Sequence, residues 1–220
     1  MSWQELLSMI GNGLWETCYM VLFSTLFSYA IGLPLGVLLV ITERGHILPN
    51  APVNSVLGTL INVLRSVPFL ILMIAVIPFT RLVMGTAIGS KATIMPLTIA
   101  AFPYVARTVE TALKEVDRGV IEAAQSMGAS RMHIVLKVMI PESMPSLVSG
   151  AAIATTNILG YSAMAGAIGG GGLGALAINY GYYRYRTDIL LVVIVVLVLL
   201  VQIIQLIGTR SSRLVDHRLK

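Results

Sequence analysis

Five long apolar stretches dominate this chain and leave it few possible folds. They cover residues 14–41, 53–79, 92–113, 146–167 and 189–207. Each is long enough to cross the roughly 30 Å hydrocarbon core of a bilayer as a helix, which needs about 20 apolar residues. Such spans form as helices because lipid offers no partner to an unpaired backbone amide. The sequence therefore predicts an all-α polytopic membrane protein with five transmembrane helices, which form a single domain over residues 1–220.

The positions of the basic residues predict how these spans are oriented. No Lys or Arg precedes Arg44, which argues against a cleaved signal peptide and favours an N-terminus outside the cytoplasm. Five spans then leave ten of the 15 Lys and Arg on the cytoplasmic side, including Arg218 and Lys220 in the C-terminal tail, and four outside. The net charge of +5 is thus mainly a topology signal, so we expect a cytoplasmic C-terminus and no nucleic-acid partner.

The chain lacks the residue patterns of a catalytic, metal or nucleotide site. His46, His133 and His217 lie in separate segments with no neighbouring cluster of metal-ligating residues. The glycines of 169–174 lack the Gly-Lys-Ser/Thr ending of a phosphate-binding loop, so a re-entrant turn before the fifth span fits them better. Cys18 lies in the first span and is expected to be a packing residue. We therefore expect no metal, no cofactor and no enzymatic activity of this chain alone.

A polar, basic segment connects the third and fourth predicted spans. Asp117 is a suitable N-cap for a short helix over 118–127, and Gly128 suits the left-handed position that ends such a helix. Ser130 can cap a second helix over 131–139. The sequence therefore predicts two short helices joined at a glycine in this cytoplasmic loop.

The first of these helices has one small apolar face. Its members lie at helical spacing and are Val120, Ala123, Ala124 and Met127. A face of small side chains allows a partner protein to approach closely. The same periodicity also fits an amphipathic helix that lies on the membrane surface, and periodicity alone leaves both interpretations open.

The residues of this loop resemble the EAA loop of ABC importer permeases. That family pattern is Glu-Ala-Ala, three residues, Gly, nine residues, then Ile-x-Leu-Pro. Here it is carried by Glu122, Ala123, Ala124, Gly128 and Pro141, with Val138 and Ile140 as conservative replacements. The resemblance implies that residues 117–141 form a two-helix coupling loop that inserts into a cleft on a separate ATP-hydrolysing subunit.

The resemblance extends over nearly the whole chain. The Arg-Ser-Val-Pro-Phe sequence at 65–69, the segment 159–166 and the glycines of 169–174 are similar to the methionine permease subunits of bacterial ABC importers. This similarity implies a type I-like permease of the bacterial inner membrane that pairs with a second copy of itself. It further implies two ATPase subunits, an extracytoplasmic substrate-binding lipoprotein and a small amino-acid substrate, methionine as the L- or D-isomer.

Five residues within the spans are candidates for the translocation pathway or its gate. Arg65 is an intramembrane charge, which has a pathway role or extends toward the membrane interface. Pro68 is expected to kink the second span. Asn157 and Tyr161 share a helix face, where they line a polar pathway or pair across helices. Met164 is a gate candidate, and ordinary helix packing explains it equally well.

Three other functions remain open at this point. A permease for another small amino acid or an osmolyte is the nearest one. An ion-coupled secondary transporter needs a carboxylate within a span, for which Glu16 and Glu110 are the candidates. Glu110 lies three residues after Arg107 and four before Lys114, so local ion pairing explains it more simply. A membrane scaffold without transport activity is the third.

Overall fold

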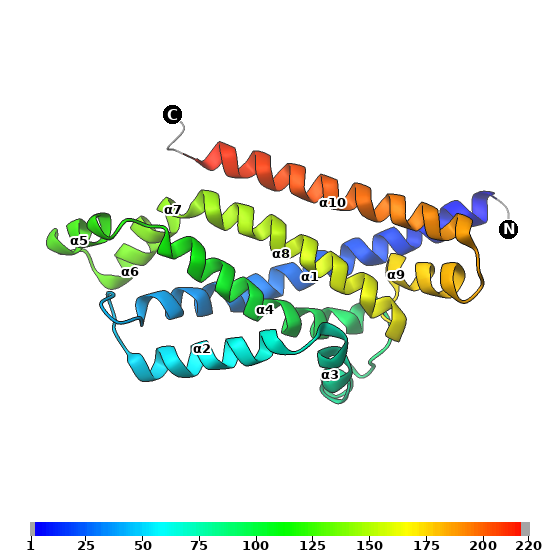
Figure 1. Ribbon diagram of the computed structural model, residues 1–220, viewed down its shortest axis with the longest axis horizontal. Helices are drawn as coiled ribbons and strands as arrows, with labels where there is room; N and C mark the ends of the chain where they lie inside the picture. The colour runs from blue at the N-terminus through cyan, green and yellow to red at the C-terminus, as the bar shows by residue number, and fades with distance from the viewer. Residues whose placement is uncertain (1–2, 217–220) are drawn as a thin grey trace. The chain divides into compact units, whose positions relative to one another are not determined.

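The computed structural model describes residues 3–216, and these residues are predominantly helical (Figure 1). The long helices are α1 (Trp3–Ile41), α2 (Ala51–Ser66), α3 (Phe69–Met84), α4 (Ser90–Lys114), α8 (Met144–Ala165) and α10 (Thr187–Val215). The short ones are α5 (Arg118–Ser126), α6 (Arg131–Ile134), the π-helical η1 (Val135–Met139), α7 (Ile140–Glu142), the 3₁₀-helical η2 (Gly166–Ile168), α9 (Gly172–Leu176) and the π-helical η3 (Ala177–Tyr182). His217, Arg218 and Lys220, which entered the sequence argument, lie outside the described residues.

Four of the described helices are long and apolar enough to cross a membrane by themselves. They are α1, α4, α8 with its continuation to Ile168, and α10. A fifth span exists if α2 and α3 are taken together as one broken span or a re-entrant loop. The continuous, kinked helix expected over 53–79 is therefore interrupted. Pro68 separates the two helices, because proline disfavours a helical residue before it, and its carbonyl accepts the first hydrogen bond of α3, from the Leu72 N–H at 3.0 Å.

The chain divides into two compact units, and long helices pass from one to the other. Unit 1 comprises Met1–Phe27, Val67–Ala101 and Thr155–Gln205, and unit 2 comprises Ser28–Ser66, Phe102–Ala154 and Leu206–Lys220. The predicted coupling loop of 117–141 lies wholly in unit 2, whereas the glycine-rich segment of 169–174 lies wholly in unit 1.

Unit 2 is held together by close packing of α1 on α4. A Cβ added to Gly32 or Gly36 would lie within 2.8 Å of a backbone oxygen of α4, so only glycine permits this contact. Val105 and Val109 of α4 are buried at the contact, in a core that continues into the loop helices. Figure 1 shows α5 and α6 beyond the last turn of α4. The end of α4 and the loop thus share one hydrophobic core.

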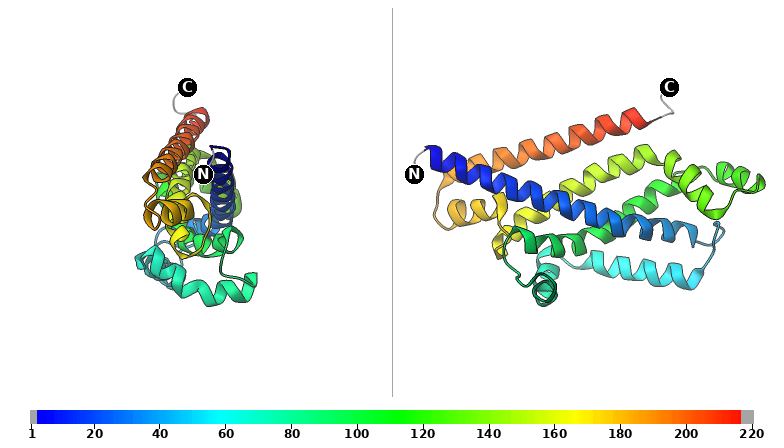
Figure 2. Two further views of the ribbon diagram at one scale, coloured as in Figure 1. Left: turned by 90° about the vertical axis from the view of Figure 1, so that its right-hand side faces the viewer. Right: turned by 180° about the vertical axis from the view of Figure 1, so that it is seen from behind.

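Unit 1 has its own buried clusters. Met20, Leu97 and Ala165 are fully buried in one of them, which joins the first half of α1 to α4 and α8. In another, Leu173 of α9 is fully buried against residues of α1 and α10. Figure 2 shows α9 beside the first half of α1. The glycine-rich segment is therefore packed against a transmembrane helix.

Candidate functional site

The coupling loop has the caps that its sequence predicts. The Asp117 carboxylate accepts the Gly119 N–H at 2.6 Å and so caps α5. Gly128 has a φ of +78°, the left-handed conformation that favours glycine, and lies just after the helix end. The Ser130 hydroxyl accepts the His133 N–H at 3.3 Å at the start of α6. These contacts confirm two helices joined at a glycine turn.

The exposed face of α5 differs from the predicted face by one residue. Val120, Ala123 and Met127 are exposed, as a docking face requires, and Met127 is 81% exposed. Ala124 is instead buried and packs beside Ile121 in the core of unit 2. The predicted position of Ala124 on the exposed face is wrong. Helical periodicity shows that residues share a face but not which face is buried, and here Ala124 is buried together with Ile121. Val120, Ala123 and Met127 are called the α5 face from here on.

The second loop helix is longer and less regular than predicted. Helical backbone continues from α6 through the π-helical η1 into α7, so that Pro141 lies within the helix and not after it. Pro141 has no N–H to donate, and the Ile140 N–H just before it reaches back five residues to the Val135 carbonyl. Ser143 then donates from its hydroxyl to the Met139 carbonyl at 2.8 Å and ends the segment.

The loop between α1 and α2 lies beside α5. His46 and Arg118 line a small cavity of about 90 Å³ that Glu122 also borders. Burial lowers the pKa of His46; Glu43 opposes this shift, and Arg118 and Lys114 add to it. Within residues 3–216, the His46 Nδ1 atom is buried and has no hydrogen-bond partner. The imidazole of His46 therefore lies against α5, and its burial there favours the neutral form.

An ion network ties the C-terminal end of α4 to its neighbours in unit 2. Glu110 pairs with Arg107 at 2.5 Å and with Lys114 at 3.0 Å, which confirms the local pairing expected from their spacing. Lys114 also pairs with Glu43 at 3.0 Å, and Arg107 donates to the Asn62 side chain at 2.8 Å. No sequence pattern predicts these last two contacts, since their partners are far apart along the chain.

Arg65 belongs to unit 2, whereas the other pathway candidates belong to unit 1. Arg65 is exposed in the last turn of α2 in unit 2, and no salt bridge among the described residues involves it. In unit 1, Pro68 precedes Phe69, whose ring stacks on Tyr161 at 4.6 Å between ring centroids. The first turn of α3 and helix α8 are thereby joined.

The candidates on α8 differ in exposure. Met164 is 49% exposed, so the described residues of this chain cover only about half of its surface. Asn157 and Tyr161 are both partly exposed, one helical turn apart on α8. This part of α8 therefore presents a thioether, an amide and a phenol to whatever lies beside the chain.

Two residues of α1 hold the start of α9, a contact that sequence reasoning missed. The Glu16 carboxylate accepts the Gly172 N–H at 2.6 Å, and the Thr17 hydroxyl accepts the Leu173 N–H at 2.9 Å. Gly172 has a φ of +71°. Glu16 thus has a structural role as the acceptor for the Gly172 N–H, and this role explains a carboxylate within the span without ion coupling. Cys18 beside it is exposed, which contradicts its expected role in packing.

Comparisons with known proteins place the chain among transport proteins. A family model described as "Binding-protein-dependent transport system inner membrane component" matches residues 32–220. A "Probable D-methionine transport system permease protein MetI" of Vibrio cholerae is 51% identical over 204 residues, which are 93% of this chain and 91% of that protein. The "Methionine import system permease protein MetP" of Bacillus subtilis is 46% identical over 212 residues, 96% of each chain.

A solved structure has the same fold. It is described as "Inward facing conformations of the MetNI methionine ABC transporter", and one of its chains superposes with a TM-score of 0.97 at 46% identity. The match covers 99% of this chain and 100% of that chain.

Proposed function

Because this chain belongs to the family of binding-protein-dependent transport system inner membrane components, we propose that it is the permease subunit of an ATP-driven methionine importer. It is a multi-pass protein of the inner membrane. The substrate assignment is supported by relatives named as methionine permeases that are 51% and 46% identical to this chain.

The geometry of the coupling loop is the observation that carries this proposal. The α5 face is apolar, exposed and held in a fixed orientation by Ile121 and Ala124 in the core. Single exposed apolar residues are common, but a capped helix that turns three of them outward is suited to a cleft on a partner. We propose that Glu122, Ala123, Ala124, Gly128 and Pro141 form the contact to an ATPase subunit, Ala124 through its support of the face.

ATP binding would move the paired loops and so the spans. Two ATPase subunits draw together on ATP, carry the α5 helices of two permease copies with them, and turn the pathway toward the outside. A substrate-binding lipoprotein then delivers methionine, and hydrolysis returns the spans to an inward-facing state. In this arrangement the N-terminus is outside, the C-terminus is cytoplasmic, and this chain supplies no catalytic group for hydrolysis.

The pathway in this proposal runs beside α8. Met164 is the gate candidate that its exposure supports, and Asn157 and Tyr161 supply polar atoms near it. Pro68 fixes the break before α3. The guanidinium of Arg65 forms no salt bridge with the described residues and is available to the carboxylate of an amino acid.

Co-purification tests the coupling proposal. The tagged chain is extracted in mild detergent from its native membrane, and mass spectrometry identifies what accompanies it. We expect a P-loop ATPase in about equal amount, and ATP-dependent methionine uptake when the complex is reconstituted in vesicles. Met127→Glu should remove the ATPase, because a charge on the α5 face opposes its burial in an apolar cleft.

A second exposed methionine provides the matched control. Met144 at the start of α8 is 38% exposed and lies outside the loop 117–141, so Met144→Glu should keep the ATPase. A chain that purifies with no nucleotide-binding partner would overturn the importer proposal and favour a scaffold. Uptake of another amino acid or an osmolyte in place of methionine would keep the permease and change its substrate.

A further inference from the structure

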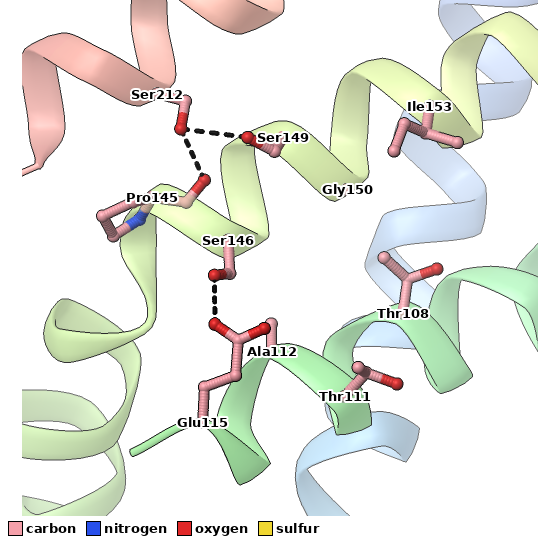
Figure 3. A pocket seen from close by; sticks show the side chains of 10 residues that line it. All are labelled: Thr108, Thr111, Ala112, Glu115, Pro145, Ser146, Ser149, Gly150, Ile153 and Ser212. Carbon is pink, nitrogen blue, oxygen red and sulfur yellow. Dashed lines mark hydrogen bonds between the residues drawn. The ribbon is translucent and has the colours of Figure 1, made fainter. Parts of the chain in front are cut away.

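A cavity of about 390 Å³ lies between the C-terminal parts of α4 and α10 and the N-terminal half of α8, all within unit 2 (Figure 3). Its size is within the range of small-molecule sites. It is lined by Thr108, Thr111, Ala112, Glu115, Pro145, Ser146, Ser149, Gly150, Ile153 and Ser212. The coupling and pathway residues described above are not part of this lining.

Each hydroxyl group of this cavity already uses its proton in a hydrogen bond to another group of the protein. Thr108 and Thr111 donate to the carbonyls of Tyr104 and Arg107 at 3.0 and 2.9 Å. Ser212 donates to the Pro145 carbonyl at 2.8 Å, Ser149 donates to the Ser212 oxygen at 3.0 Å, and Ser146 donates to the Glu115 carboxylate. A hydroxyl has one proton and two lone pairs, so these five side chains can only accept hydrogen bonds from a ligand.

The described residues that line the cavity supply only negative charge. Glu115 is its only charged residue among the described residues that line it, and no salt bridge of residues 3–216 involves this carboxylate. A carboxylate surrounded by acceptors attracts a cation that has several N–H groups to donate. An ammonium group has three such donors, whereas an anion or a carbonyl compound would find none.

Apolar atoms also line the cavity away from Glu115. Figure 3 shows Ile153 on that side, together with Gly150 and Thr108, whose methyl group faces Gly150. Gly150 is needed there because a Cβ would lie 2.3 Å from the Thr108 methyl group. The volume is far larger than the roughly 30 Å³ of a water molecule, so a bare ion would not fill it. The lining suits a cation that carries an apolar body.

We propose that this cavity binds the primary ammonium group of a small amphipathic ligand, with Glu115 as the counter-ion and the five hydroxyl oxygens as acceptors. Two sources share this chemistry. One is an amino acid with an apolar side chain, since α8 carries both the cavity lining and, further along, the pathway candidates. The other is a lipid with an ethanolamine head group, whose acyl chains could lie along the exposed Ile207 and Leu214 of α10 in the same unit.

Native mass spectrometry of the purified, delipidated complex tests the proposal with defined probes. The probes are L-methionine, N-acetyl-L-methionine, and short-chain phosphatidylethanolamine and phosphatidylcholine with equal acyl chains. The acetylated amino acid lacks the ammonium group, and the quaternary nitrogen of choline has no N–H. We expect at least one of the two primary amines to bind to the wild type at least tenfold more tightly than its blocked counterpart.

Variants then assign that binding to the cavity. Glu115→Gln should weaken it about tenfold, and Thr111→Val should weaken it less because one acceptor is lost from several. Glu142→Gln changes an exposed carboxylate outside the cavity and should leave binding unchanged. The amine that responds to Glu115→Gln identifies the source, and equal binding by wild type and Glu115→Gln for both amines would overturn the proposal.

The ammonium site does not depend on the proposed importer function. Methionine uptake is measured on the same preparations, so a wrong substrate assignment would appear as absent uptake, while ethanolamine-lipid binding can still depend on Glu115. Absent amine binding with normal methionine uptake would reject this site and leave the importer proposal in place.

Discussion

The coupling loop of 117–141 and the glycine-rich segment of 169–174 are both irregular connections, but they are held in place in different ways. In the loop, Asp117 and Ser130 cap helices two or three residues away. In the glycine-rich segment, the caps of α9 come from α1, 156 residues earlier in the chain. Loops with local caps can be read from the sequence, whereas those with distant caps cannot.

Crowding at Gly166, which packs against the end of the glycine-rich segment, provides the largest expected effect. A Cβ at Gly166 would lie 2.3 Å from the Ala175 backbone nitrogen, so the two short helices η2 and α9 must separate to accept it. We expect Gly166→Ala to lower the free energy of unfolding by about 3 kcal/mol, since backbone atoms cannot move aside as a flexible side chain can. Thermal unfolding in detergent, followed by the loss of monodisperse protein, measures this.

Gly160 in the adjacent helix α8 is the matched control. A Cβ at Gly160 would meet no atom within 4 Å, so Gly160→Ala should be neutral or slightly stabilising. Equal losses from the two substitutions would mean that the close packing of the glycine-rich segment does not contribute to stability.

Gly128→Val tests the coupling loop by backbone strain alone. A Cβ at Gly128 meets no atom within 4 Å, and its φ of +78° costs a β-branched residue about 2 kcal/mol. We expect reconstituted, ATP-dependent uptake to fall about tenfold or more while the permease stays folded, because the strain lies between the two loop helices. Gly128→Asn should retain most uptake, since asparagine tolerates this conformation.

A substitution at Gly85 is the control that distinguishes general backbone strain from a specific effect on coupling. It ends α3 with a φ of +73° and also has open space around it, so Gly85→Val imposes the same kind of strain outside the loop. The coupling proposal fails if the Gly128 and Gly85 variants lose uptake equally.

Apolar runs and caps made much of this fold predictable. Four spans followed from length and hydropathy, and the two loop helices followed from Asp117, Gly128 and Ser130. The broken span was predicted only as a kink, because proline at position 68 indicates an interruption but not how the chain continues after it.

Contacts between distant segments account for what the sequence did not predict. Ala124 was placed on the exposed face because periodicity defines faces and not which one is buried. Glu43 and Asn62 joined the ion network at α4 without any signal in their own segments. The cavity at Glu115 depends on hydroxyl groups from three helices, and their donors and acceptors can be assigned only when all three are in place.

Removing the distant cap of α9 should have a moderate effect. Glu16→Ala leaves the Gly172 N–H without its acceptor at a partly buried position, which costs about 1.5 kcal/mol. A lower unfolding midpoint is expected, with faster amide exchange at 172–176. Glu16→Gln keeps an acceptor oxygen and should be milder, and uptake should be independent of the proton gradient in both the wild type and this variant. Proton-dependent uptake in the wild type that is lost in Glu16→Gln would instead favour the ion-coupled transporter.

The local caps of the coupling loop should give the smallest effects and rank by geometry. Asp117→Ala removes a charged acceptor at 2.6 Å from the Gly119 N–H and should destabilise α5 by about 1 kcal/mol. Ser130→Ala removes a longer contact of 3.3 Å and should cost α6 about 0.5 kcal/mol. Amide exchange in 118–126 should rise about fivefold in the first variant and remain unchanged in the second. If exchange instead rises throughout both loop helices in either variant, the loop unfolds as one unit. The local caps that allowed its helices to be predicted would then not be what stabilises each helix.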